Sequence, residues 1–130
     1  MSAKEEVQQL TERIIAASAK GDLAPFASAL DEDLEVFDHV AYRFESKDSF
    51  LGYLQGAMGG AESFTFAFHQ PSVRAFNDDA AVVNAYDRAA TFPKGGGAPT
   101  VLCGRTTLMY VKKGGNWKIV SAHFSPLPKE

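Results

Sequence analysis

Two side chains in the last quarter of the chain have the chemistry to act on a small molecule. His123 carries an imidazole, which can take up and release a proton near neutral pH. Arg105 is a permanent cation that would hold a carboxylate or an enolate. Each also has a structural interpretation, in which His123 hydrogen-bonds a neighbouring Thr or Ser and Arg105 forms a salt bridge with Asp87 or Glu45. We predict that both line a pocket and treat them as candidate catalytic residues.

Further polar side chains alternate with apolar ones in the same part of the chain. Residues 105–111 and 117–125 are rich in β-forming types, and polar groups interrupt runs that otherwise have the composition of core strands. Such alternation is typical of a strand that lines a pocket. Tyrosine and asparagine on earlier strand-like segments would orient a ligand, although Tyr in a strand also serves as amphipathic packing. The predicted ligand-binding residues are Tyr42, Asn84, Tyr86, Thr107, Ser121 and Ser125.

The register of the closing hairpin decides whether the two candidates share a face of the sheet. A two-residue loop at residues 114–115 would place Arg105 opposite Phe124, and Arg105 and His123 would then point to opposite faces. A three-residue loop with a Gly bulge would instead pair Arg105 with His123. We favour the three-residue loop, because residues 113–115 suit a type I turn followed by a left-handed glycine.

Hydrophobic periodicity predicts the segments that must position these residues. Apolar residues recur every three or four positions through residues 5–20, which predicts an amphipathic helix that ends at Gly21. A second, shorter helix follows Asp22, and a third covers residues 46–57. The predicted strands are residues 34–37 and 42–44, a strand from residue 63 onward, residues 80–91, and the closing hairpin of 105–111 and 117–125. Helices followed by long strands predict an α+β fold in which the helices cover one face of the sheet.

Composition limits the class of protein. The 130 residues suffice for one domain, which we expect to span residues 1–130, and 45% are hydrophobic and 22% charged. A formal net charge of −3 without a basic cluster argues against nucleic acid as a partner. A single cysteine, Cys103, excludes an internal disulfide, and the charged N-terminus and short apolar runs predict neither a signal peptide nor a membrane span. We therefore expect a cytoplasmic protein with no membrane partner.

Metal and cofactor sites do not follow from the spacing of the remaining polar residues. His39, His69 and His123 lie on different predicted elements without cysteines or paired carboxylates, so we expect no metal. Residues 94–97 lack the Gly-Lys-Ser/Thr of a phosphate loop, and no nucleophile elbow accompanies the serines of the last strand. The expected chemistry therefore uses no cofactor.

The order of elements and the pattern near the C-terminus resemble the SnoaL-like branch of the nuclear transport factor 2-like superfamily. The resemblance covers essentially the whole chain. Its sharpest part is an Arg-x-Thr strand, a glycine turn, and a Trp-Lys-Ile-Val-x-x-His-x-Ser strand, carried here by Arg105, Thr107, Gly115, Trp117, Lys118, Ile119, Val120, His123 and Ser125. The resemblance implies a cone-shaped, curved antiparallel sheet of about five or six strands wrapped against three N-terminal helices, in the nuclear transport factor 2-like or cystatin-like manner.

The same resemblance implies a pocket closed by the N-terminal helix and a homodimer joined through the outer face of the sheet. It also adds Asp38 to the candidate catalytic residues, because relatives with acid–base activity often carry an acidic residue on an early strand or on the sheet. Asp38 and His39 fit a solvated turn equally well.

Two classes of function remain open, because relatives of this fold include both enzymes and association modules. In the first, the chain binds a small hydrophobic or aromatic ligand that bears a carboxylate or a carbonyl. The protein would then be a cofactor-free isomerase, cyclase or dehydratase that works by proton transfer, with Arg105, His123 and Asp38 as its catalytic residues. In the second, the chain is a non-catalytic dimerisation module with a residual pocket. The sequence leaves open whether the chain is an enzyme.

Overall fold

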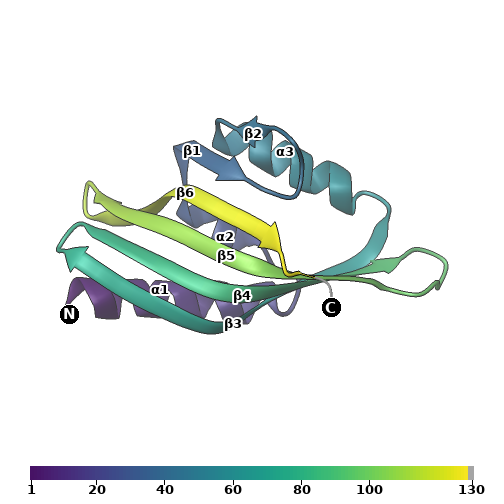
Figure 1. Ribbon diagram of the computed structural model, residues 1–130, viewed down its shortest axis with the longest axis horizontal. Coiled ribbons are helices and arrows are strands. Elements are labelled where there is room, and N and C mark those ends of the chain that lie inside the picture. The colour runs from purple at the N-terminus through teal and green to yellow at the C-terminus, as the bar shows by residue number, and fades with distance from the viewer. Residues whose placement is uncertain (129–130) are drawn as a thin grey trace.

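Within residues 1–128, which the computed structural model describes, three helices and six strands follow in the predicted order (Figure 1). The helices are α1 (Ala3–Ser18), α2 (Ala24–Ala29) and α3 (Lys47–Met58). The strands are β1 (Leu30–Phe37), β2 (Arg43–Phe44), β3 (Ala61–Asn77), β4 (Ala80–Pro93), β5 (Thr100–Lys113) and β6 (Asn116–Pro126). The predicted α+β fold class is therefore confirmed.

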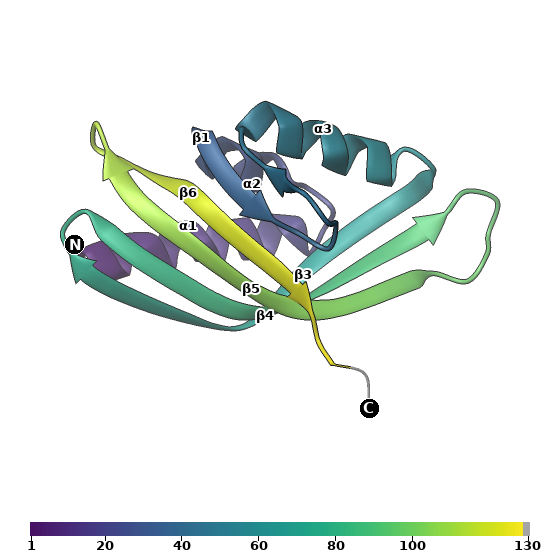
Figure 2. The same cartoon turned by 45° about the horizontal axis from the view of Figure 1, so that its top comes forward.

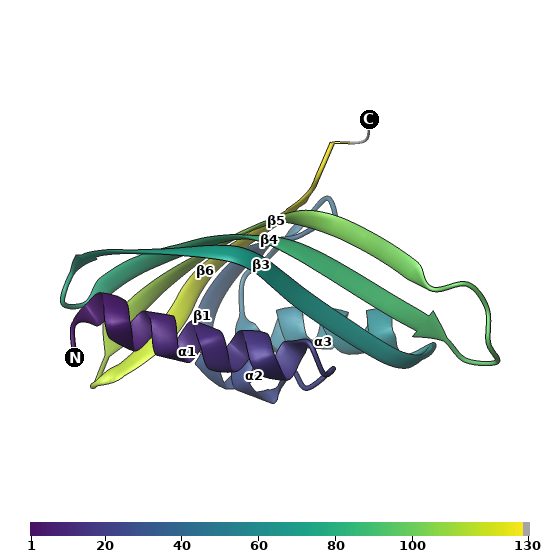
Figure 3. The same ribbon diagram turned by 90° about the horizontal axis from the view of Figure 1, so that it is seen from below.

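The strands form one curved sheet in the order β2-β1-β6-β5-β4-β3. Neighbouring strands run antiparallel except for β1 and β6, which run parallel, so the sheet contains one parallel pairing within the predicted antiparallel arrangement. Figures 2 and 3 show that the sheet bends around the helices, which all lie on its concave face. The convex face has no helix over it, and we call it the outer face.

Local sequence explains where α1 and α3 begin and which side they bury. The Ser2 hydroxyl accepts from the Glu5 backbone N–H at 3.2 Å while the Glu5 carboxylate accepts from the Ser2 backbone N–H at 3.1 Å, a reciprocal cap at the start of α1. The buried positions of α1 recur every three or four residues and include Val7 and Ile14. At the start of α3 the Ser46 hydroxyl accepts from the Ser49 backbone N–H at 3.1 Å. No helix in the described part of the chain is long and apolar enough to cross a bilayer.

The closing hairpin differs from the predicted register. Its loop is Gly114 and Gly115, both with positive φ (55° and 83°), and Lys113 pairs with Asn116, so the predicted three-residue loop is wrong. The register then shifts by one residue, because Met109 pairs with Ser121 and Tyr110 with Ile119, which leaves Val120 as the extra residue of a bulge. The bulge, and not the turn, decides which side chains of β5 and β6 share a face.

Candidate functional site

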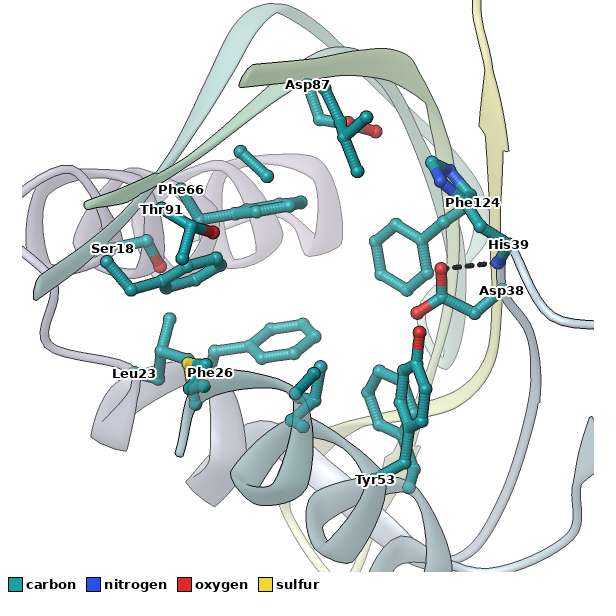
Figure 4. A pocket seen from close by; sticks show the side chains of 17 residues that line it. Ser18, Leu23, Phe26, Asp38, His39, Tyr53, Phe66, Asp87, Thr91 and Phe124 are labelled. Atoms are coloured by element: carbon teal, nitrogen blue, oxygen red, sulfur yellow. Dashed lines mark hydrogen bonds between the residues drawn. The ribbon is translucent and has the colours of Figure 1, made fainter. Parts of the chain in front are cut away.

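A cavity of about 200 Å³ lies between the concave face of the sheet and the helices. Its walls are mostly apolar, with aromatic rings from four different elements, Phe26, Phe50, Phe66 and Phe124 among them. The polar side chains that reach it are few: Ser18, Asp38, His39, Tyr53, Asp87 and Thr91 (Figure 4). An apolar hollow with a small number of polar groups is the usual form of a small-molecule site. Because its volume lies below the roughly 300–1,000 Å³ of sites for drug-sized compounds, only a small ligand fits.

Asp87 is the buried acid of this cavity. It projects from β4, is only 5% exposed, and its Oδ2 accepts a hydrogen bond from Thr106 Oγ1 at 2.5 Å. Burial raises the pKa of Asp87 and the nearby Asp38 carboxylate adds to that rise, against the opposing effects of the Thr106 hydrogen bond and of His39. Asp87 is thus a carboxylate that holds a proton more tightly than usual, inside an apolar space.

Gly104 makes room for this carboxylate. It pairs with Asp87 across the β4–β5 ladder and is itself buried. A Cβ at this position would lie 3.0 Å from Oδ1 and 3.2 Å from Oδ2 of Asp87. A side chain at position 104 would therefore compete for the space that the carboxylate occupies.

A second group of polar side chains faces the same end of the cavity. Asp38 and His39 directly follow β1, and Tyr53 projects from α3. The His39 backbone N–H donates to Asp38 Oδ1 at 2.6 Å, and Figure 4 shows the Asp38 carboxylate and the Tyr53 hydroxyl pointing toward one another. Burial, followed by the negative charge of Asp38, raises the pKa of Tyr53. Tyr53 therefore keeps its proton at neutral pH and can donate a hydrogen bond.

Arg105 and His123 do not project into the cavity, so their predicted placement is wrong. Arg105 pairs with Ser125 and Thr107 with His123, so the bulge at Val120 places His123 on the same face as Arg105, the outer face, where both are exposed. They do share a face, as the favoured register required, but it is the face away from the helices. The alternative salt bridges of Arg105 are also absent within residues 1–128, since Asp87 faces inward and Glu45 pairs with Arg43.

The predicted ligand-binding residues lie outside the cavity as well. Thr107 donates to Asn84 Oδ1 at 2.5 Å on the outer face, next to the 46% exposed Tyr86. Tyr42 is 59% exposed between β1 and β2, with its ring edge-on to Phe44 at 5.2 Å. The other two predicted contacts share the outer face of β6, namely Ser121 and Ser125. Of the predicted site residues, only Asp38 reaches the cavity.

The residues that sequence reasoning missed are His39, Tyr53, Asp87 and Ser18. Asp87 did carry a signal, because it follows three apolar residues at alternate positions of β4, Ala81, Val83 and Ala85. A carboxylate among core positions requires a compensating group or a function. No comparable pattern marks His39 or Tyr53, which reach the cavity only because β1 ends and α3 crosses at this place.

The cavity therefore brings together two kinds of group needed for proton transfer. Asp87 is a carboxylate of raised pKa, and His39 and Tyr53 can donate protons or hydrogen bonds at the same end. Residues 1–128 contain no cluster of three or more His, Cys, Asp or Glu arranged to hold a metal ion. What the geometry can do is acid–base chemistry on a small, largely apolar molecule.

Comparison with known proteins places this geometry in a family. The chain is 27% identical over 128 residues to the calcium/calmodulin-dependent protein kinase type II subunit delta of Oryctolagus cuniculus, which covers 96% of this chain. It spans only about a quarter of the length of that relative, because the match covers 24% of the kinase subunit.

Solved structures share the fold over nearly the full length. A nuclear transport factor 2-like protein of unknown function from Pseudomonas putida KT2440 superposes with a TM-score of 0.77 and 25% identity, over 98% of this chain and 89% of the other. The hub homology domain of the calcium/calmodulin-dependent kinase II of Chlamydamonas reinhardtii has a TM-score of 0.72 and 25% identity, covering 98% and 100%. A putative scytalone dehydratase from Novosphingobium aromaticivorans DSM 12444 superposes with a TM-score of 0.78, over 94% of this chain and 82% of the other. At 15% identity, this similarity shows the fold alone.

The sequence itself agrees with the structural similarity. The family model described as a SnoaL-like domain matches residues 7–129, which is nearly the entire chain. The elements that it spans include every strand of the sheet and all residues that line the cavity. The chain belongs to the SnoaL-like family, a branch of the nuclear transport factor 2-like superfamily.

Proposed function

We propose that this protein binds a small, mostly apolar ring compound in its cavity and transfers protons on it without a cofactor. The observation that carries the proposal is Asp87, a buried carboxylate of raised pKa that faces an apolar hollow. A fully buried charge without a cationic partner is costly, and proteins keep such groups where chemistry needs them. A raised pKa makes Asp87 a stronger base than an exposed carboxylate.

The roles of the polar groups follow from their positions. Asp87 accepts a proton from a carbon next to a carbonyl, the electron pair of the C–H bond forms a C=C bond, and the carbonyl π pair moves to oxygen. Tyr53 donates a hydrogen bond to that oxygen, or His39 supplies it with a proton. In a β,γ-unsaturated ketone, the carbonyl re-forms as Asp87 returns the proton to the γ carbon, which completes an isomerisation. In a β-hydroxy ketone, the carbonyl re-forms as the hydroxyl leaves the β carbon and takes the proton from Asp87 to depart as water, which completes a dehydration.

Deuterium exchange tests this proposal directly. Bicyclic ketones such as 2-tetralone are incubated with the protein in D₂O, and loss of the proton signal next to the carbonyl is followed by ¹H NMR. We expect exchange above the buffer rate for the wild type and loss of that exchange in Asp87→Asn. Asp78→Asn makes the same chemical change in the exposed β3–β4 turn and should exchange as the wild type does. Equal exchange by Asp87→Asn and the wild type would refute the role of Asp87.

A second candidate function is self-association through the outer face. Phe37 and Tyr86 are 51% and 46% exposed there, and the Phe37 ring lies 5.9 Å from that of His123. Large exposed apolar side chains on an uncovered sheet are typical of an interaction surface. A solved relative of this chain is named a hub homology domain, which supports an oligomeric role. We propose a homodimer, and sedimentation should show Tyr86→Glu as a smaller species than the wild type.

A further inference from the structure

Ser18 is a buried hydroxyl that the protein itself does not satisfy. It is the last residue of α1, is 1% exposed, and lines the cavity. Among the buried side-chain polar atoms of residues 1–128, its Oγ is the one without a hydrogen-bond partner. Other buried hydroxyls are paired: Thr11 with Tyr110 at 3.3 Å and Thr106 with Asp87. A buried hydroxyl is stabilising only when it is hydrogen-bonded, and alanine would fill this position at lower cost.

Ser18 lies at the end of the cavity away from the acid–base groups. Thr91 shares this end, because it pairs with Phe64 on β3 and the Phe64 backbone approaches the chain just after α1. The approach is so close that a Cβ on Gly21 would lie 2.6 Å from the Phe64 carbonyl oxygen. Figure 4 shows Ser18 and Thr91 across the cavity from His39. Asp87 precedes Thr91 by four residues on the same strand, which corresponds to about 13 Å along β4. Apolar rings fill the walls between the two ends.

The charges around the cavity restrict the ligand. No Lys or Arg side chain of the described residues lines it, whereas Asp38 and Asp87 both do. A carboxylate or phosphate would therefore meet like charge without a lysine or arginine to hold it. The expected carboxylate-bearing ligand depended on Arg105, which lies on the outer face. A hydroxyl such as that of Ser18 suits a neutral oxygen, because it can donate to a carbonyl or ether and exchange hydrogen bonds with another hydroxyl.

We infer that Ser18 binds a neutral oxygen at the far end of the ligand, and that the cavity selects small ring compounds bearing one oxygen at each end. One oxygen, a carbonyl, lies at the Asp87 end, and the other, a hydroxyl, carbonyl or ether, meets Ser18 with Thr91 beside it. This inference rests on the proposed proton-transfer function, because it takes its orientation from the reacting carbonyl. It adds a selectivity that the acid–base groups alone do not supply.

Two ketones that differ by one hydroxyl test the inference. Dissociation constants for 2-tetralone and 6-hydroxy-2-tetralone are measured by calorimetry with the wild type. We expect the hydroxylated compound to bind about tenfold more tightly, the effect of one added hydrogen bond. Ser18→Ala should bind both compounds equally while its affinity for 2-tetralone stays at the wild-type value. Ser121→Ala, which removes a serine from the outer face, should keep the tenfold preference.

The possible failures are distinguishable. If Ser18→Ala retains the preference, or if the wild type shows none, the role of Ser18 is overturned while exchange at the Asp87 end still stands. If both ketones bind with the preference but neither exchanges deuterium, the proposed proton transfer is overturned and Ser18 remains a contact of a binding protein. Binding of neither ketone overturns both. Ser18→Ala is expected to fold, with an unchanged or higher denaturation midpoint, because it removes an unpaired buried hydroxyl.

Discussion

Gly104→Ala is the substitution for which the structure gives the most specific expectation. A Cβ at this position would lie 2.6 Å from the Ser125 carbonyl oxygen, in addition to its contacts with the two oxygens of Asp87. The first contact is with backbone of the neighbouring strand β6, which cannot rotate away as a flexible side chain would. Overpacking of this kind costs about 1–3 kcal/mol of the free energy of unfolding. For a domain of this size that corresponds to a decrease in Tm of roughly 4–12 °C.

Gly52→Ala is the matched control. Gly52 lies inside α3, and an added Cβ there would meet no atom within 4 Å. Replacement of glycine by alanine in a helix interior stabilises by about 0.5–1 kcal/mol, so the same chemical change should act in the opposite direction. Urea denaturation followed by the fluorescence of Trp117, the only tryptophan in the sequence, measures both variants.

The outcome also bears on the site. If part of the cost comes from the carboxylate, Gly104→Ala should be less destabilising in an Asp87→Ala background than in the wild type. A Gly104→Ala protein as stable as the wild type would show that β5 and β6 are not as close at this position as the structure has them. The same result would show that a side chain at position 104 does not compete with the Asp87 carboxylate for space.

Three further expectations concern buried or hydrogen-bonded groups. The pKa of Asp87 is raised in the folded state, so the stability that its protonation gives is fully present below the ordinary carboxyl pKa near 3.9 and is lost as the pH rises through the higher folded value. Between about pH 4 and pH 7, the free energy of unfolding of Asp87→Asn should therefore rise relative to that of the wild type. Thr11→Val and Tyr110→Phe should each cost about 1–3 kcal/mol in urea denaturation by leaving one hydroxyl unpaired, and the double variant should cost less than their sum. Hydrogen bonds from Trp117 and, second in size, from Lys112 lower the pKa of Glu6 in the folded state. The stability that ionised Glu6 contributes is therefore present above about pH 4.3 and is lost as the pH falls through the lower folded value, so Glu6→Gln should show a smaller decrease of the denaturation midpoint at acid pH than the wild type.

The sequence predicted the elements well because their signals are local. Capping residues and apolar spacing define α1 and α3, and alternation from Phe64 to Phe68 defines the start of β3. These patterns depend on neighbours within a few residues, and each agrees with the fold in which it occurs. The order and type of the elements therefore follow from the sequence alone.

The candidate site could not be predicted in the same way, because it depends on which face of the sheet the helices cover. The positions that hold Arg105 and His123 alternate regularly, and alternation shows only that two faces differ, not which of them the helices cover. Polar residues on those positions fit an uncovered outer face as well as a pocket. The extra residue Val120 then shifts the pairing without any glycine or proline to mark it.

The two proposed functions use opposite faces of the same strand and can be tested by neighbouring substitutions. Tyr86 points to the outer face and Asp87 to the cavity, because successive side chains of a strand alternate. If proton transfer and self-association are independent, Tyr86→Glu should change the oligomeric state and leave deuterium exchange in place, while Asp87→Asn should do the reverse. Loss of exchange in a folded, monomeric Tyr86→Glu protein would mean that the sheet transmits the state of its outer face to the cavity. That result would make association a condition of the activity instead of a second, separate function of the fold.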